Sequence, residues 1–359
     1  MSSNTFGQLV TLTTFGESHG NCIGGVLDGC PAGLHLDEAH LAKKMSMRRP
    51  GQSSVTSPRS EADQVKIVSG VFEGITTGTP IAFIIENTNV RSKDYETLKA
   101  LYRPGHADWV YEMKYGHRDW RGGGRSSARE TAVRVAAGAI AEQVLNQLGV
   151  YLYGGCVQIG SVKAHDFNWD TVMDNPLYCP DPHAAKVMQE LIEAIKAEGD
   201  SIGGKVRVGA SGYPAGLGLP LYHKLEADIA SAMMSINAVK AVEIGDGFEV
   251  VTQKGSEHRD EMLDEKSFLS NHAGGIVGGI STGQPIEVSI AVKPPSSIAV
   301  EGKTFTKDRK PTTVSVKGRH DPCVAIRAVP VAQAMLALVL LDHWCLSFHS
   351  QPLKKSTSN

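Results

Sequence analysis

The sequence predicts an α+β protein of two similar halves, in which apolar helices lie between two sheets. One observation is a repeated motif, because Gly29-Cys-Pro-Ala-Gly-Leu34 returns as Gly212-Tyr-Pro-Ala-Gly-Leu217. A second repeat follows in the same order, since the glycine-rich segment 70–81 returns as residues 275–286. The third observation is a pair of helical segments, after Glu130 and after Arg327, that are apolar almost all round and so require burial on more than one side. We expect the two halves to pack these helices together.

Other architectures fit the pattern less well. A solenoid needs shorter and more numerous units, and a doubly wound parallel sheet needs a strict alternation of strands and helices that is not seen here. We therefore expect a single domain whose halves span about 6–150 and 200–346. Residues 151–200 are predicted to be a peripheral insertion and residues 347–359 a flexible tail.

Hydrophobic patterning places the main elements. Strands are expected at 10–14, 65–69, 71–72 and 80–86, and helices at 37–47, from 132 onward and near 184–197. The first of these helices ends at Arg48-Arg49-Pro50-Gly51, whose arginines either reach a ligand or face water. The apolar stretch 328–341 is shorter than the roughly 18 residues of a membrane span and is expected to be a buried helix.

The most distinctive stretch is a glycine-rich turn that carries arginines, Arg121-Gly-Gly-Gly-Arg-Ser-Ser-Ala-Arg-Glu-Thr131. Its glycines allow positive φ and a close approach of the backbone to a ligand. Ser127 and Glu130 have the spacing of a capping box, which marks the start of a helix. A helix N-terminus with nearby arginines favours phosphate or carboxylate. The alternative is a plain turn with solvated arginines.

Composition and charge narrow the class of protein. The 359 residues carry a net charge of −2 and are 41% hydrophobic, so nothing indicates nucleic-acid binding or disorder. Residues 91–134 hold ten Lys and Arg against six Asp and Glu, which fits an anionic small molecule or a basic surface. The six cysteines show no C-x-x-C pair, so neither a metal site nor a disulfide framework is expected. A cytoplasmic setting is the simplest, since no export signal precedes the first strand.

Two histidines stand in open, polar surroundings. Gly16-Glu17-Ser18-His19-Gly20 matches the G-x-S-x-G elbow of serine hydrolases, but that elbow needs a helix directly after the serine, whereas residues 21–29 predict a strand or turn. His19 titrates near neutrality unless it is a structural histidine. His106 lies in a basic loop, Arg103-Pro-Gly-His-Ala-Asp108, and four aromatic residues follow that either line a ligand or pack in a core: Trp109, Tyr111, Tyr115 and Trp120.

The second half has candidates of its own. Asn237 lies on an apolar helix, where an amide without a partner is costly. Lys293-Pro-Pro-Ser-Ser297 ends a strand with a cation and two hydroxyls. If the halves are related by a pseudo-twofold axis, the segment Gly318-Arg-His-Asp-Pro322 lies near the glycine-rich turn.

These motifs together resemble the chorismate synthase family, and the resemblance covers about residues 6–345. The motifs that carry it are Thr13-Thr-Phe-Gly-Glu-Ser-His-Gly20, Arg103–Asp108, Arg121–Thr131 and Gly318–Pro322. The resemblance implies a homotetramer of β-α-β sandwich protomers with two antiparallel sheets around central helices. It also implies an anti-1,4-elimination of phosphate from 5-enolpyruvylshikimate 3-phosphate to give chorismate, the last step of the shikimate pathway to aromatic amino acids. The resemblance further implies a requirement for reduced FMN, without net redox change.

Site residues follow from the same resemblance. His19 is expected to protonate the departing phosphate, His106 to hold the protonation state of the reduced flavin, and Asp321 to act near the flavin N5. Arginines suit the phosphate and two carboxylates of the substrate. The substrate-binding candidates are Arg48, Arg49, Arg103, Arg129 and Arg134, with Arg125 shared between substrate and flavin. The flavin-binding candidates are Arg125, Ser126, Ser127, Asn237, Ala238, Gly278, Lys293, Pro294, Pro295, Ser296, Ser297 and Arg319.

The chain also departs from the family pattern. Met47 and Ser54 occupy positions where many relatives carry arginine, so contacts made there, including a pyridine-nucleotide (NADP) contact beside Arg48, are not carried over. Pro295 stands where threonine is common. No dinucleotide fingerprint is present, and we expect an external source to reduce the flavin. The alternative function is a non-catalytic flavin or phospho-ligand binding protein, against which His19, His106 and Asp321 argue.

Overall fold

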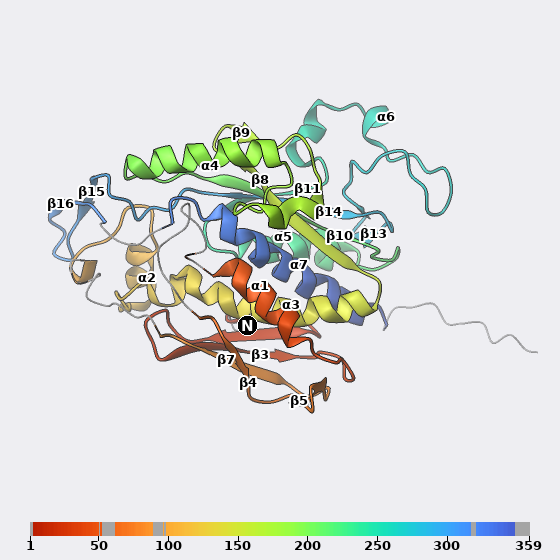
Figure 1. Ribbon diagram of the computed structural model, residues 1–359, viewed down its shortest axis with the longest axis horizontal. Coiled ribbons are helices and arrows are strands. Elements are labelled where there is room, and N and C mark those ends of the chain that lie inside the picture. Colours follow the sequence, from red (N-terminus) through yellow and green to blue (C-terminus); the bar gives the residue numbers. More distant parts are fainter. Residues whose placement is uncertain are drawn as a thin grey trace, which may run out of the picture.

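The protein is an α+β sandwich with helices between two antiparallel sheets (Figure 1). The computed structural model describes residues 3–49, 51, 62–88, 96, 98–316 and 321–348. The central layer contains α1 (Glu38–Arg48), α3 (Thr131–Gln147) and α7 (Ala325–Ser347), and α5 (Leu225–Met234) packs against α7. One sheet lies on either side of them, as the sequence predicted.

Each sheet has five strands. The first has the order β1 (Thr5–Phe6), β2 (Thr11–Phe15), β3 (Cys22–Asp28), β7 (Ile81–Glu86) and β4 (Val65–Ile67). The second has the order β11 (Val239–Ile244), β14 (Ile286–Val292), β10 (Gly204–Ser211), β8 (Tyr151–Ile159) and β9 (Val162–Lys163). Hairpins β5 (Val71–Phe72) with β6 (Ile75–Thr76), and β12 (Ile276–Val277) with β13 (Ile280–Ser281), extend from corresponding places in the two halves.

The internal repeat is visible in the hydrogen bonds. In the first half, the hydroxyl of Thr76 accepts from Leu34 N at 3.0 Å and donates to the carbonyl of Pro31. In the second half, the hydroxyl of Ser281 accepts from Leu217 N at 3.0 Å and donates to the carbonyl of Pro214. The strand orders β2-β3-β7-β4 and β8-β10-β14-β11 also correspond. The repeated sequence motifs therefore form the same turn twice.

Helices α3 and α7 are the equivalent helices of the two halves and cross at the centre. A Cβ placed on Gly138 of α3 would lie 2.3 Å from the Cβ of Ala334 on α7, so the two backbones approach closely. The expectation that the last apolar stretch is too short for a membrane span is wrong on length, because α7 has 23 residues. Its most apolar window is 94% buried inside the protein, which identifies α7 as a core helix.

Two expectations on the boundaries of elements are also corrected. Residues 151–159 are not peripheral, because β8 pairs with β10 inside the second sheet. The insertion comes after β9 and contains η4 (Trp169–Asp174) and α4 (Pro182–Ala197), which covers the outer side of the second sheet in Figure 1.

The capping box at Ser127 is not formed. Ser127 caps only the short 3-10 turn η3 (Ala128–Glu130), and α3 begins at Thr131. Of the expected tail, only residues 347 and 348 lie within the described range.

One end of the sandwich is built by insertions from both halves. The first half contributes α2 (Asp108–Tyr115) and η2 (Gly124–Ser126) between β7 and α3, and the second contributes the hairpin β15 (Gly302–Phe305) and β16 (Pro311–Val314) between β14 and α7 (Figure 1). The rings of Trp109 and Phe305 join them with centroids 5.1 Å apart. The remaining elements lie in the second half: η5 (Leu221–His223), α5 (Leu225–Met234), η6 (Gly247–Thr252) and α6 (Gly255–His258).

Candidate active site

A cavity of about 1210 Å³ opens at the end where the two insertions meet. Residues from both halves line it, so the pseudo-twofold arrangement brings the glycine-rich turn and the segment at Asp321 together as expected. Most candidate residues from the sequence lie on its wall: Arg103, His106, Arg125, Ser126, Ser127, Arg134, Asn237, Ala238, Lys293, Pro295, Ser296, Ser297 and Asp321. Seven Lys and Arg side chains line the cavity against five Asp and Glu, which leaves it positive.

The glycine-rich turn passes between the two candidate histidines. Gly122, Gly123 and Gly124 all have positive φ, at 62°, 91° and 53°. A Cβ on Gly122 would lie 2.6 Å from His19 Nε2, and a Cβ on Gly123 would lie 3.3 Å from His106 Cε1. Glycine is therefore required on two counts, the left-handed backbone and the room for each imidazole.

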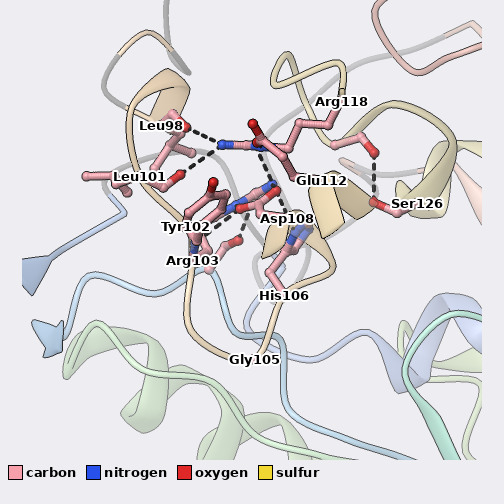
Figure 2. Close-up of polar contacts among 12 residues, drawn as sticks. Leu98, Leu101, Tyr102, Arg103, Gly105, His106, Asp108, Glu112, Arg118 and Ser126 are labelled. Atoms are coloured by element: carbon pink, nitrogen blue, oxygen red, sulfur yellow. Dashed lines mark hydrogen bonds and ion pairs between the residues drawn. The ribbon is translucent and has the colours of Figure 1, made fainter. Parts of the chain in front are cut away.

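His106 is held by a carboxylate that sequence analysis did not single out. Its Nδ1 lies 3.0 Å from Oδ1 of Asp108, at the first residue of α2 (Figure 2). Burial lowers the pKa of His106, and Arg103 and Lys293 lower it further, while Asp108 acts in the opposite direction. Burial raises the pKa of Asp108, but hydrogen bonds from Arg103 and His106 outweigh burial and hold it well below its usual range.

The guanidinium of Arg103 donates its hydrogen bonds to other residues of the protein. Its Nε and Nη2 donate to the two carboxylate oxygens of Asp108 at 2.7 and 2.9 Å, and its Nη1 donates to Ser297 Oγ at 3.3 Å. Although Arg103 lines the cavity, its charge is largely neutralised by Asp108. The expected role in substrate binding has little support from this geometry.

Two other cations lack such neutralisation. Arg125 donates to the hydroxyl of Thr14 at 2.7 Å, and Lys293 donates to the carbonyl of Gly105 at 3.2 Å. Within the described part of the chain, neither contacts a carboxylate. Burial, with a smaller effect of Lys240, lowers the pKa of Lys293. These charges are available to an anionic ligand.

Arg134 and Asp321 each have a charged neighbour on the cavity wall. Arg134 forms an ion pair of 3.0 Å with Glu130 on the preceding turn and donates to Ser235 Oγ at 2.6 Å. Asp321 is 5% exposed and forms an ion pair with Arg327. The sequence analysis missed Arg327. An arginine near the end of an apolar helix is common, and it does not by itself indicate a ligand site.

Asn237 lines the cavity but does not lie on a helix as the sequence predicted, because α5 ends at Met234. Its Nδ2 donates to the carbonyl of Ser126 at 3.0 Å, whereas its Oδ1 is buried and has no partner among the described residues. The next residue, Ala238, has a φ of 70°, which is unusual for a residue with a side chain. The glycine backbone of the turn and the cations Arg125 and Lys293 fit a ligand that carries a phosphate.

Several candidates do not line the cavity. Arg48 and Arg129 both pair with Asp63, and Arg48 also donates to the carbonyl of Arg129 at 3.3 Å. Arg48 is 1% exposed, and burial lowers its pKa to about 10, with Asp63 opposing this. His19, Arg49 and Pro294 are not on the wall either, although His19 lies next to Gly122, which is. Gly278 lies in the turn of the hairpin formed by β12 and β13, at the opposite end of the sandwich from α2 in Figure 1. Arg319 and Ser54 lie outside the described residues.

The turn at Ser18 excludes a serine hydrolase elbow. It joins the antiparallel strands β2 and β3, and no helix follows the serine, because β3 begins at Cys22. The hydroxyl of Ser18 donates to the carbonyl of Arg121 at 3.5 Å.

The four aromatic residues divide between the two roles considered for them. Trp109 packs with Tyr102 and Phe305, and Trp120 packs against the small cluster of Leu98 and Val316. Tyr111 and Tyr115, on the exposed side of α2, line the cavity with Lys114 and His117. A helical spacing from 111 to 115 is the one signal that could have indicated this shared face.

Comparison with known proteins decides the family. The family model described as "Chorismate synthase" matches residues 10–345. The chain belongs to the chorismate synthase family. It is 57% identical over 342 residues to the chorismate synthase of Francisella tularensis subsp. mediasiatica, covering 95% of this chain and 97% of that protein. The chorismate synthase of Francisella tularensis subsp. novicida has the same identity and coverage. A crystal structure of a chorismate synthase matches with a TM-score of 0.76 and 31% identity, covering 95% of this chain and 93% of that one.

Membership of the family supplies the activity. The chain is a phosphate lyase that converts 5-enolpyruvylshikimate 3-phosphate to chorismate, the final step of the shikimate pathway, and it uses reduced FMN. The residues of the cavity fit this cofactor, because Arg125 and Lys293 can face its phosphate and neither contacts a carboxylate among the described residues.

Proposed function

We propose that phosphate elimination takes place in the cavity between the two insertions and that His19, His106 and Asp321 act there. The observation that carries this proposal is the position of the glycine-rich turn, whose Gly122 and Gly123 are flanked by the rings of His19 and His106. Asp321 lines the same cavity. His106 and Asp321 thus face a space that is large enough for a cofactor and a substrate together, since single-ligand pockets typically have about 300–1,000 Å³. The ring of His19 lies next to Gly122, which lines the same space.

The cations of the cavity bind the negative groups of the substrate. Arg125 lines the wall and contacts no carboxylate among the described residues, so it can face phosphate or carboxylate. Arg134 lines the same wall, with its Nε paired to Glu130. The pairing of Arg48 and Arg129 with Asp63 argues against the same role for those two residues. We assign Arg49 no contact with the substrate, because it is absent from the cavity wall.

The three titratable groups divide the proton transfers. His19 donates a proton to the phosphate as it leaves, so that the leaving group is not a fully ionised anion. His106 offers its ring nitrogen to a group in the cavity, and Asp321 orients or accepts a proton on the opposite half of the wall. When bound, reduced FMN would supply electron density for the loss of phosphate and would take up the hydrogen that leaves the substrate ring, so that no net oxidation results. Arg125, Ser126, Asn237, Lys293, Ser296 and Ser297 are the residues that would hold it.

Assembly and cellular setting are part of the same proposal. We infer a homotetramer from the resemblance, and light scattering after size exclusion tests it directly. A cytoplasmic location is supported by the six cysteines, which all lie in described residues and are all free thiols. An external reductant is inferred because the sequence has no dinucleotide fingerprint.

The decisive assay measures phosphate release and chorismate absorbance anaerobically, with enzyme, 5-enolpyruvylshikimate 3-phosphate and photoreduced FMN. Turnover with photoreduced FMN but not with FMN and NADPH in the dark is expected, and it would identify flavin reduction as external. Turnover in the dark with NADPH would overturn the external reductant and add a reductase activity. Tight binding of FMN with no product in either condition would favour the non-catalytic alternative.

A further inference from the structure

Asp108 is a carboxylate at the cavity that contacts three basic side chains, and it has no role in the reaction as proposed above. It lines the cavity, its side chain is 2% exposed, and it contacts Arg103, His106 and Arg118. We propose that Asp108 is a positioning residue, which fixes His106 as the tautomer protonated at Nδ1 so that Nε2 faces the cavity. The inference rests on the role proposed for His106 and deepens it.

The geometry of His106 supports one tautomer. An ionised carboxylate only accepts hydrogen bonds, so the contact of 3.0 Å between Asp108 Oδ1 and His106 Nδ1 requires the proton on Nδ1. The opposite edge of the ring points to the glycine-rich turn. A Cβ on Gly123 would lie 3.3 Å from His106 Cε1 and 3.6 Å from Nε2. In the neutral imidazole, Nε2 is then the acceptor that a group in the cavity meets.

Two arginines fix the carboxylate itself. Arg103 donates three hydrogen bonds to it, from its backbone N at 3.1 Å, Nε at 2.7 Å and Nη2 at 2.9 Å. Arg118 lies 3.2 Å from Oδ1 through Nη1. Because the carboxylate is held by several partners, rotation of Asp108 away from His106 would break most of these bonds.

Arg118 ties this arrangement to the backbone. Its Nη2 donates to the carbonyls of Leu98 and Leu101 at 2.8 Å each, and its Nε pairs with Glu112 at 3.0 Å (Figure 2). Arg118 is 7% exposed and so is fixed inside the protein. The series runs from the backbone at 98–101 through Arg118 and Asp108 to the ring of His106. It resembles the way in which a carboxylate orients the histidine of a hydrolytic triad.

Burial and the charged groups around His106 favour its neutral ring. A neutral ring has one proton, and the tautomer determines which nitrogen can accept a hydrogen bond. Asp108 is the anion that faces the ring, and Arg103 from the same loop and Lys293 from the end of β14 are the cations. Burial and these cations lower the pKa of His106 below its usual value, although the hydrogen bond that its Nδ1–H donates to Asp108 acts in the opposite direction. At neutral pH the ring therefore has one proton, and Asp108 decides which nitrogen carries it.

The first test reads the tautomer without any assay of activity. The protein labelled with ¹⁵N-histidine is examined by two-dimensional NMR at pH 7 to 8, and His106 is assigned by comparison with His106→Gln. The expected spectrum shows a protonated Nδ1 and an unprotonated Nε2. A neutral ring with its proton on Nε2, or an average of the two forms, would overturn the proposal. This measurement needs no variant of Asp108 to fold.

The second test asks whether Asp108 acts through His106. Asp108→Asn keeps the size of the side chain but provides both a donor and an acceptor, so the tautomer is no longer fixed. We expect a fall in kcat of about 10²-fold or more, within the range for a positioned acid or base, with little change in KM. The pKa of His106 should also fall further, because an anion beside the ring is removed. In a His106→Gln background, Asp108→Asn should cause no further loss. Independent, multiplicative losses would contradict the proposal.

A matched control separates positioning from stability. Asp342→Asn changes another buried carboxylate, which accepts from the backbone N–H groups of residues 8, 9 and 10 and is not on the cavity wall. It should leave kcat and the His106 spectrum unchanged. If His106→Gln keeps full activity while the Nδ1 tautomer is observed, the catalytic role of His106 fails and the positioning by Asp108 stands. The two failures are thus distinguishable.

Discussion

The imidazole of His19 lies against the backbone of Gly122, so closely that a Cβ at residue 122 would be 2.5 Å from His19 Cδ2. Gly122 also has a φ of 62°. Gly122→Ala should therefore displace His19 as well as strain the backbone. We expect kcat to fall by about 10²-fold, the scale of a misplaced catalytic group. Steady-state kinetics with photoreduced FMN measures this loss.

Gly74→Ala is the control for that substitution. Gly74 has a φ of 76°, and nothing lies within 4 Å of a Cβ placed there. Both variants place a side chain on a residue in the left-handed conformation, which destabilises the fold by about 1–2 kcal/mol. Only the variant at Gly122 should lose activity. Equal kinetics in the two variants would show that contact with Gly122 does not position His19.

Arg125 should contribute binding free energy through its charge. It lines the cavity and contacts no carboxylate in the described residues, so Arg125→Gln removes a cation that is open to a bound anion. A charge-assisted hydrogen bond contributes about 1.5–3 kcal/mol, which predicts a Kd for FMN or substrate that is roughly 10- to 150-fold weaker. Titration calorimetry measures it, and the effect should shrink at high salt.

Arg309→Gln is the control for net charge. Arg309 is exposed in the turn between β15 and β16 and is absent from the cavity wall. Its loss lowers the net charge by the same amount and should leave the Kd almost unchanged. A similar weakening in both variants would indicate long-range attraction of the ligand in place of a contact with Arg125.

The fold was predictable where the sequence carries repeated local chemistry. The motifs at Gly29 and Gly212 recur because each half needs the same turn, in which a hydroxyl at Thr76 or Ser281 bonds the backbone. Strand β8 was missed because Gly154 and Gly155 weaken a strand pattern. A Cβ on Gly155 would lie 2.3 Å from the carbonyl of Tyr178, so glycine is required there by tertiary contact. That contact is invisible in the sequence.

Sequence motifs predicted which residues belong to the candidate site, but not which carboxylate pairs with which arginine. Motifs brought out His106, Arg125 and Asn237, all of which line the cavity. Glu130 was expected to cap a helix, yet its carboxylate pairs with Arg134 one turn later and accepts from Thr14. Arg48 was expected to meet substrate, but Asp63 holds it inside the protein. Which carboxylate meets which arginine depends on the assembled fold.

The close contact of α3 and α7 predicts that Gly138→Ala destabilises the protein. Alanine normally stabilises a helix relative to glycine by about 1 kcal/mol. Here a Cβ on Gly138 would lie 2.4 Å from Ala334 Cα and 2.7 Å from its carbonyl oxygen. Overpacking of this kind costs typically about 1–3 kcal/mol, so the net effect should be a loss. Urea unfolding measures it. The double variant with Ala334→Gly should recover part of the loss, and additive losses would contradict direct contact.

Asp181 predicts a component of the acid sensitivity of the fold. It caps α4 and accepts from the backbone N–H groups of His165 and Ala184, each at 3.0 Å, among others. These hydrogen bonds lower the pKa of Asp181 from 3.8 to about 2, and the bond from His165 has the largest effect. The unfolded state therefore takes up a proton at a higher pH than the folded state. The stabilisation is fully present above pH 4 and is lost as the pH falls toward 2.

Asp181→Asn should reveal this component in urea unfolding at several pH values. Asparagine still caps a helix, but it cannot supply the charge, so the variant should be less stable than the parent protein at pH 6. The difference should shrink steadily between about pH 4 and pH 3, because protonation removes the same charge from the parent. Glu190→Gln, an exposed position on the same helix, should show a much smaller difference throughout. A difference for Asp181→Asn that stays constant with pH would mean that the loss comes from hydrogen-bond geometry and not from the ionised carboxylate.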